Sequence, residues 1–259
     1  KNRAETTRAR AAPEKNTRNA AEPINKIKRR TLMHREEYMN MPALQAQNRL
    51  FARTFKWMFA GLLVTALFAW FTYSSGLYIR FLYDNTFFVL IIAEVVMVLL
   101  FSFLFRRLSP MAVSILFFAY AIVNGITMSV IFAVYEMSSI VVLFLAAAAL
   151  FGGFALYGYN YKGDLTRWGP LLLISLLIAI VMSVINILFL KAQMFEIFID
   201  CFVLFLFFGL TVYDMNKIKR MSMTADGSRK LHVYAAMELY LDFINIFLRL
   251  LSLFGKSKN

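Results

Sequence analysis

Residues 86–105 have the sequence TFFVLIIAEVVMVLLFSFLF, in which Glu94 is the one charged side chain. An α-helix rises 1.5 Å per residue, so twenty such residues are long enough to cross the roughly 30 Å hydrocarbon core of a bilayer. Five more runs have a similar length and composition: about 55–75, 111–135, 138–159, 170–190 and 197–213. The sequence therefore predicts a polytopic membrane protein.

The composition supports this prediction and excludes soluble folds. Apolar residues make up 60% of the 259-residue chain and charged residues 17%, and Phe occurs 27 times. Soluble domains average roughly 45–50% apolar and about 25% charged residues. One Cys and two His exclude a disulfide scaffold, a Cys/His zinc site and an intramembrane Cys–His nucleophile. The runs lack the alternation of a β-barrel, so we predict an all-α bundle.

A seventh apolar segment, about 232–254, carries a stripe of polar side chains. The members of the stripe recur at steps of four and three residues: Glu238, Asp242, Asn245, Arg249 and Ser252. This spacing puts them on one side of a helix, which must face protein or water because lipid cannot solvate it. We therefore expect this helix at the centre of the bundle. The stripe is either a buried ion-pair network or a polar pathway, and we favour a pathway lined by Glu238, Asn245 and Arg249.

The loops predict how the chain crosses the membrane. Every second connection is basic, with these side chains: Arg106, Arg107, Lys162, Arg167, Lys217, Lys219, Arg220, Arg229 and Lys230. Basic loops stay in the cytoplasm, so we expect a cytoplasmic N-terminus. Lys256 and Lys258 would lie outside if the last segment crosses, so a crossing and a re-entrant segment both remain open.

The N-terminal segment 1–54 holds 13 Lys/Arg and 5 Glu, and it has no periodic apolar pattern. We expect a disordered cytoplasmic tail here, followed by a seven-helix membrane domain over 55–255. The tail lacks interleaved aromatic residues, so we expect no nucleic-acid partner. The chain does not begin with Met, and part of residues 1–38 is interpreted as an upstream extension.

Two acidic residues flank the predicted hairpin between the last two segments. Asp214 ends the sixth run, and Asp242 lies within one helical turn of it in depth. Two close carboxylates cannot both ionise at low cost, so we expect the pair to share a proton and to act as a pH-sensitive latch. Arg106 or Arg107 lies at a similar depth and could hold one carboxylate ionised. Glu94, about 12 Å into the second run, is either a structural hydrogen-bonding group or part of an ion pathway.

Four stretches then resemble a known family. They are FARTFKWMFAGLLVTALFAW (51–70), AYAIVNGITMSVIFAVY (119–135), LTVYDMNKIKRM (210–221) and AAMELYLDFINIFLRLLSLFG (235–255). Together they resemble the Bax-inhibitor family, the transmembrane Bax inhibitor motif proteins, over about Ala52 to Gly255. The resemblance implies two groups of three helices around a central last helix. The compact loops and the short C-terminus suggest a bacterial member, located in the plasma membrane; a eukaryotic member would be expected in the ER or Golgi membrane.

The resemblance implies a function as well. Members of this family mediate a passive, pH-sensitive calcium leak across internal or bacterial membranes. By motif, the aspartates of the gate map onto Asp214 and Asp242, the arginine partner onto Arg106, and the acidic pore residue onto Glu94. We therefore expect a calcium-leak channel in which Glu94, Asp214 and Asp242 are transient oxygen ligands of Ca²⁺. The expected partners are the bilayer, Ca²⁺ as the transported ion and H⁺ as the regulator, with no other cofactor.

The sequence fits two other function classes poorly and leaves a third open. An intramembrane aspartyl protease needs Gly-x-Gly-Asp, but Asp242 lies in Tyr-Leu-Asp-Phe, and the Pro-Ala-Leu at 42–44 precedes the first run. We therefore expect no enzymatic activity. A retinal protein needs a lysine in the last segment, which has none. The resemblance leaves open a non-transporting regulator of cell-death or membrane-protease pathways, with a membrane-protein partner.

Overall fold

The computed structural model describes residues 45–83, 86–105, 107–224 and 230–258. Two compact units divide the chain, Lys1–Asn48 and Arg49–Asn259, and the second holds almost all of the described residues. Residues 1–44 of the predicted tail lie outside the described part. Within that part the regular elements are helices and no strand occurs, which confirms the all-α prediction.

The helices correspond to the predicted runs. In chain order they are a first helix (Gln45–Ser74), α2 (Tyr78–Tyr83), α3 (Thr86–Leu104), α4 (Pro110–Val134), α5 (Met137–Asn160), α6 (Trp168–Ile185) with the π-helical turn η1 (Asn186–Leu190), α7 (Gln193–Thr224) and α8 (Leu231–Phe254). Six of the described helices are long and apolar enough to cross a membrane, and all six coincide with the predicted spans. The central helix α8 is not among these six.

Two helices extend beyond the predicted runs. The first helix starts ten residues early, at Gln45, and α7 continues eleven residues past 213, to Thr224. Hydropathy marks where lipid surrounds a helix, and it does not mark where the helix ends. The extension of α7 is rich in Met, Lys and Arg, which favour helix. Asp214 therefore lies inside α7, and the helix continues beyond it.

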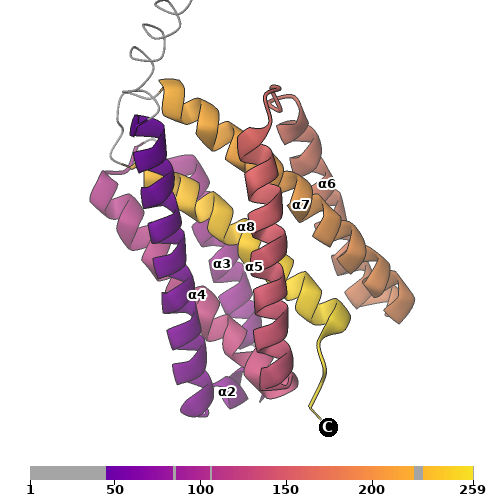
Figure 1. The fold of residues 1–259 in the computed structure, drawn as a ribbon. Coiled ribbons are helices and arrows are strands. Elements are labelled where there is room, and N and C mark those ends of the chain that lie inside the picture. The colour runs from indigo at the N-terminus through magenta and orange to yellow at the C-terminus, as the bar shows by residue number, and fades with distance from the viewer. Residues whose placement is uncertain (1–44, 84–85, 106, 225–229, 259) are drawn as a thin grey trace, which may run out of the picture. The chain divides into compact units, whose positions relative to one another are not determined.

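The helices form two groups of three around α8 (Figure 1). The first group is the first helix, α3 and α4, in which α3 packs on α4. The second group is α5, α6 and α7, in which α5 and α6 both pack on α7. The first helix meets α4 at Gly125, where a Cβ atom would lie 2.5 Å from the carbonyl oxygen of Thr65. A similar close approach joins α5 to α7 at Gly158, 2.5 Å from the carbonyl oxygen of Val212. Small residues thus bring the backbones together in both groups, as is common between membrane helices.

Burial separates the central helix from the outer ones. Fourteen of the 24 residues of α8 are buried, whereas α3 buries one of 19, Phe101. The two most apolar spans, α3 and α6, are also the least buried. This inversion of the usual soluble pattern means that their apolar faces are in contact with lipid. The predicted central position of α8 is confirmed.

Contacts at its two ends show that α8 runs the full length of the bundle. Beside its first residue, the ammonium of Lys230 donates to the carbonyl oxygens of Phe105 (2.7 Å) and Leu108 (2.9 Å), between α3 and α4. After its last residue, Lys258 N–H donates to the Val134 carbonyl oxygen (2.8 Å), at the other end of α4. The C-terminal helix therefore extends from one end of α4 to the other.

Candidate functional site

Asp214 on α7 and Asp242 on α8 are both buried, at 8% and 3% exposure. Asp242 interacts electrostatically with Asp214 and with Glu238, which lies one turn before it on α8. The hydroxyl of Thr211, one turn before Asp214, is also a neighbour of Asp242. The structure thus brings together the two aspartates that the sequence singled out, and it adds Glu238 to them. We call Asp214, Asp242, Glu238 and their lysine neighbour, described next, the acidic cluster.

Lys217 supplies the positive charge of the acidic cluster. It lies one turn after Asp214, and its ammonium donates to a carboxylate oxygen of Glu238 and to the Tyr234 hydroxyl (3.1 Å). The same ammonium lies 5.1 Å from the centre of the Tyr234 ring. Sequence reasoning counted Lys217 among the loop charges and missed this role. Its spacing of three residues from Asp214 was the available signal, since residues three apart share a helix face.

Charge and hydrogen bonding in the acidic cluster are unbalanced. Three carboxylates interact with the one ammonium of Lys217. One oxygen of Asp242 (Oδ2) and one of Glu238 (Oε2) are buried and have no hydrogen-bond partner within the described residues. An unsatisfied buried acceptor costs about 1–3 kcal/mol. A proton on either carboxyl group reduces the negative charge and creates the missing donor, so this arrangement is suited to taking up protons.

The other half of the polar stripe on α8 also faces α7. Asp200 on α7 is 4% exposed, and its two carboxylate oxygens accept hydrogen bonds from Arg249 and Ser252. Asn245, between the two halves, donates to the Leu241 carbonyl oxygen of its own helix (2.8 Å). We expected Arg249 and Asn245 to line a pathway. In the structure, Arg249 donates to α7 and Asn245 donates to a carbonyl oxygen of α8 itself.

Glu94 belongs to a different polar group, which we call the α4 network. On α3 it is half-buried and interacts with Asn124 and Thr127 of α4. Asn124 accepts a hydrogen bond from the Tyr240 hydroxyl of α8 (3.1 Å), and that hydroxyl is 2.6 Å from the Thr65 hydroxyl on the first helix. Oε1 of Glu94 is buried and has no hydrogen-bond partner among the described residues. The α4 network therefore links Glu94 to the central helix.

The expected calcium ligands do not form one site. Within the described residues, no three His, Cys, Asp or Glu side chains are grouped so that they could hold a metal ion. Glu94 has its own partners on α4, and Asp214 and Asp242 have theirs between α7 and α8. A fixed coordination shell made of these three carboxylates is therefore not present in this structure.

The predicted arginine partner is not among the described contacts. Arg106 lies outside the described residues, and the side chain of Arg107 is exposed. Within the described part of the chain, the cation that acts on both aspartates is Lys217.

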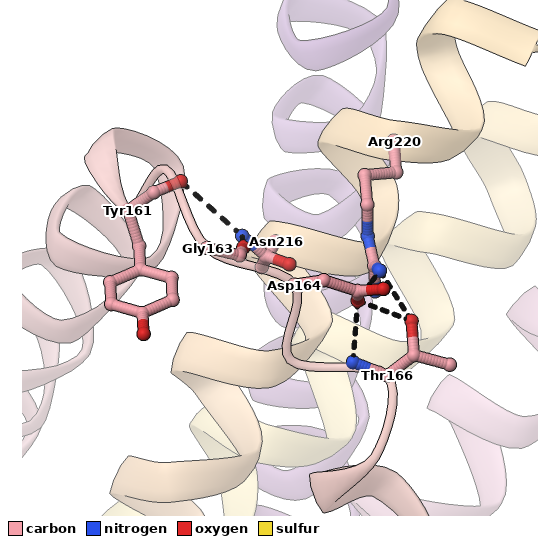
Figure 2. Close-up of polar contacts among 6 residues, drawn as sticks. All are labelled: Tyr161, Gly163, Asp164, Thr166, Asn216 and Arg220. Carbon is pink, nitrogen blue, oxygen red and sulfur yellow. Dashed lines mark hydrogen bonds and ion pairs between the residues drawn. The ribbon is translucent and has the colours of Figure 1, made fainter.

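A polar clasp fixes the extended end of α7, as Figure 2 shows. The Asn216 side-chain amide, two residues after Asp214, donates to the carbonyl oxygens of Gly163 (3.2 Å) and Tyr161 (3.4 Å) in the α5–α6 connection. Arg220 forms an ion pair with Asp164. These contacts tie the part of α7 that carries Asp214 to a loop of its own group. A movement of α7 here must break the clasp or carry the loop with it.

Comparison with known proteins assigns the family. The family model described as inhibitor of apoptosis-promoting Bax1 matches residues 47–259. The chain belongs to the Bax-inhibitor family. This confirms the resemblance drawn from the four sequence stretches, and with the six apolar helices it makes the chain an integral membrane protein.

Several bacterial proteins are similar to this chain over most of its length. The inner membrane protein YbhL of Escherichia coli K12 is 36% identical over 214 residues, which cover 80% of this chain and 91% of YbhL. An uncharacterized protein of Borreliella burgdorferi is 33% identical over 219 residues, 82% of this chain and 94% of its own length. A membrane protein of Streptococcus pyogenes is 33% identical over 168 residues, 64% and 72% of the two chains.

Proposed function

We propose that this Bax-inhibitor protein is a passive calcium-leak channel whose gate is closed by a proton shared between Asp214 and Asp242. The observation that carries the proposal is the acidic cluster, in which two buried aspartates and the half-buried Glu238 face one ammonium, and two buried carboxylate oxygens lack a donor among the described residues. A structural ion pair would need none of this imbalance. The proposal assigns ion conduction to the chain and no catalytic reaction.

The gate works through the charge of the cluster. At low pH a protonated carboxyl group donates to its neighbour, and α7 and α8 stay together at this end. At higher pH both aspartates ionise, and the two like charges repel each other more strongly than they would in water because both side chains are buried. Lys217 offsets part of this repulsion, and Arg106 is proposed to stabilise one ionised aspartate. The calcium leak therefore rises with pH.

The proposed ion pathway uses oxygen ligands in succession, since hard cations prefer oxygen. Glu94 in the α4 network and the carboxylates of the acidic cluster are the candidates, and a calcium ion retains water between them. Glu238 belongs to the gate end of this path. Asn245 and Arg249 join it only if their present hydrogen bonds rearrange.

The proposed orientation follows from the basic loops. Lysine and arginine gather at the end where α7 ends and α8 begins, so that end and the N-terminus are assigned to the cytoplasm. The gate then senses cytoplasmic pH. The E. coli relative is an inner membrane protein, which supports a bacterial plasma membrane as the location.

The test is calcium flux into proteoliposomes between about pH 5 and 8, a range in which perturbed carboxylates titrate. Asp214→Asn and Asp242→Asn each keep a hydrogen-bonding group that cannot ionise, so we expect the flux to remain at its low-pH level throughout. Asp200→Asn is the matched control, because it makes the same change on α7 outside the acidic cluster and should keep the pH response.

Two results would contradict the proposal. A pH response that survives in both gate variants would contradict the latch and would still be consistent with a calcium leak. The absence of flux at every pH would remove the leak itself, and it would favour a non-transporting regulator that acts through a membrane-protein partner.

A further inference from the structure

An apolar groove runs along the outside of α8, away from the acidic cluster. It has a volume of about 300 Å³ and lies between the first helix, α4 and α5, with Ile244 and Phe247 of α8 also lining it. Thr65 is the one polar side chain in its wall. The Thr65 hydroxyl already donates to the Ala121 carbonyl oxygen (3.0 Å) and contacts the Tyr240 hydroxyl. The groove thus offers a ligand almost no hydrogen bonding.

The groove begins at one end of the bundle and runs into the hydrocarbon depth. Its wall includes Met137, the first residue of α5, and Leu145, eight residues further on. At 1.5 Å per residue this spans roughly 12 Å along the helix. Ala66 on the first helix and Leu145 on α5 are exposed, the latter at 61%, so the groove opens sideways. In a membrane-spanning bundle this opening faces acyl chains.

A cation lies at the mouth of the groove. The ammonium of Lys258 donates to the carbonyl oxygen of Phe132 (2.7 Å), whose side chain lines the groove, and to the Tyr73 hydroxyl (3.4 Å). Both acceptors are neutral, so the ammonium keeps its full charge and a third N–H. The ring of Trp70 lies 6.0 Å from that of Phe132. Trp and Tyr are enriched at the depth of lipid headgroups, which places this mouth at the membrane interface.

We propose that the groove is a binding site for one anionic phospholipid, with an acyl chain between the first helix and α5 and the phosphate on Lys258. The apolar wall selects a hydrocarbon chain because a soluble ligand needs polar groups to orient it. The charge at the mouth selects the anionic headgroup. The bound chain lies against Ile244 and Phe247, so this lipid contacts the central helix. This inference does not depend on calcium conduction.

The test is native mass spectrometry of the full chain, in which added phosphatidylglycerol and phosphatidylcholine are counted as bound lipids. Ala66→Phe fills the groove and should weaken the binding of both lipids by more than about tenfold, since each buried CH₂ contributes strongly to binding. Leu67→Phe is the matched control, because Leu67 is exposed, lies beside Ala66 and does not line the groove.

The headgroup is tested separately. Lys258→Ala should weaken phosphatidylglycerol binding by about fivefold, to the level of phosphatidylcholine binding. This is the change expected for the loss of one basic residue at an anionic surface. Lys162→Ala removes an exposed lysine from the α5–α6 connection and should change nothing. Equal lipid binding by wild type and Ala66→Phe would overturn the proposal. So would a shift from dimer to monomer in Ala66→Phe with unchanged lipid binding, because the groove would then be an interface between two copies.

Discussion

The two ends of the α7–α8 contact have similar side chains in opposite states. At one end, Asp200 receives hydrogen bonds from Arg249 and Ser252 on both of its carboxylate oxygens. At the other end, Asp214 and the two carboxylates of α8 share Lys217 alone among the described cations. The same pair of helices thus carries an ion pair with one cation for one carboxylate and an acidic cluster with one cation for three carboxylates.

The difference separates a structural role from a responsive one. A buried ion pair with one partner for each charge can hold two helices in register. A buried cluster with excess carboxylates changes its charge when protons arrive or leave, and its contribution to helix packing changes with it. Asp200 therefore acts as the fixed point of the α7–α8 contact, and the acidic cluster as its variable end.

The largest predicted effect concerns the fixed end. Arg249→Ala leaves the Asp200 carboxylate buried without its cation, and we expect a loss of about 4 kcal/mol in unfolding free energy. Denaturation of the purified protein in detergent measures this loss. The double variant Arg249→Ala/Asp200→Asn should recover part of it, and a loss below about 1 kcal/mol in the single variant would contradict the assignment.

A smaller effect with a distinct pH dependence is expected at the variable end. Lys217→Met removes the one cation that acts on the described carboxylates there, and we expect a loss of about 2–3 kcal/mol at pH 8. The loss should shrink towards pH 5, because protonation of the carboxylates then removes the repulsion that Lys217 offsets. Adding Glu238→Gln should restore stability at pH 8. Equal losses at the two pH values would show that the cluster does not change its charge.

The smallest effect is expected at the clasp on the extension of α7. Asp164→Ala breaks the ion pair with Arg220. Because the Asp164 side chain is 67% exposed, we expect a loss of only about 0.5 kcal/mol in unfolding free energy. Asn216→Ala is the informative companion, because Asn216 is buried and donates to two loop carbonyl oxygens. Thermal unfolding in detergent would rank the two variants, and a larger effect for Asp164→Ala would contradict this order.

Sequence reasoning located the membrane spans and the central helix because lipid acts on average composition and on the side of a helix that it contacts. It could not assign partners. The stripe on α8 shows which face is buried, but only the crossing of the helices shows that Arg249 meets Asp200. Lys217 was missed for the same reason, since its partner Glu238 lies on another helix. The clasp of Asn216 formed on a part of α7 that hydropathy assigns to a loop.

The central position of α8 has a consequence for how the protein is made. Because α8 follows the surrounding helices in the chain, a ribosome makes it after them. Until then Asp200 lacks Arg249, and Asn124 lacks the Tyr240 hydroxyl. Before α8 inserts, the incomplete bundle therefore holds polar side chains that lack their partners on α8. The residues after α8 add backbone contacts, since Lys256 and Lys258 form hydrogen bonds with the backbone at the α4–α5 connection.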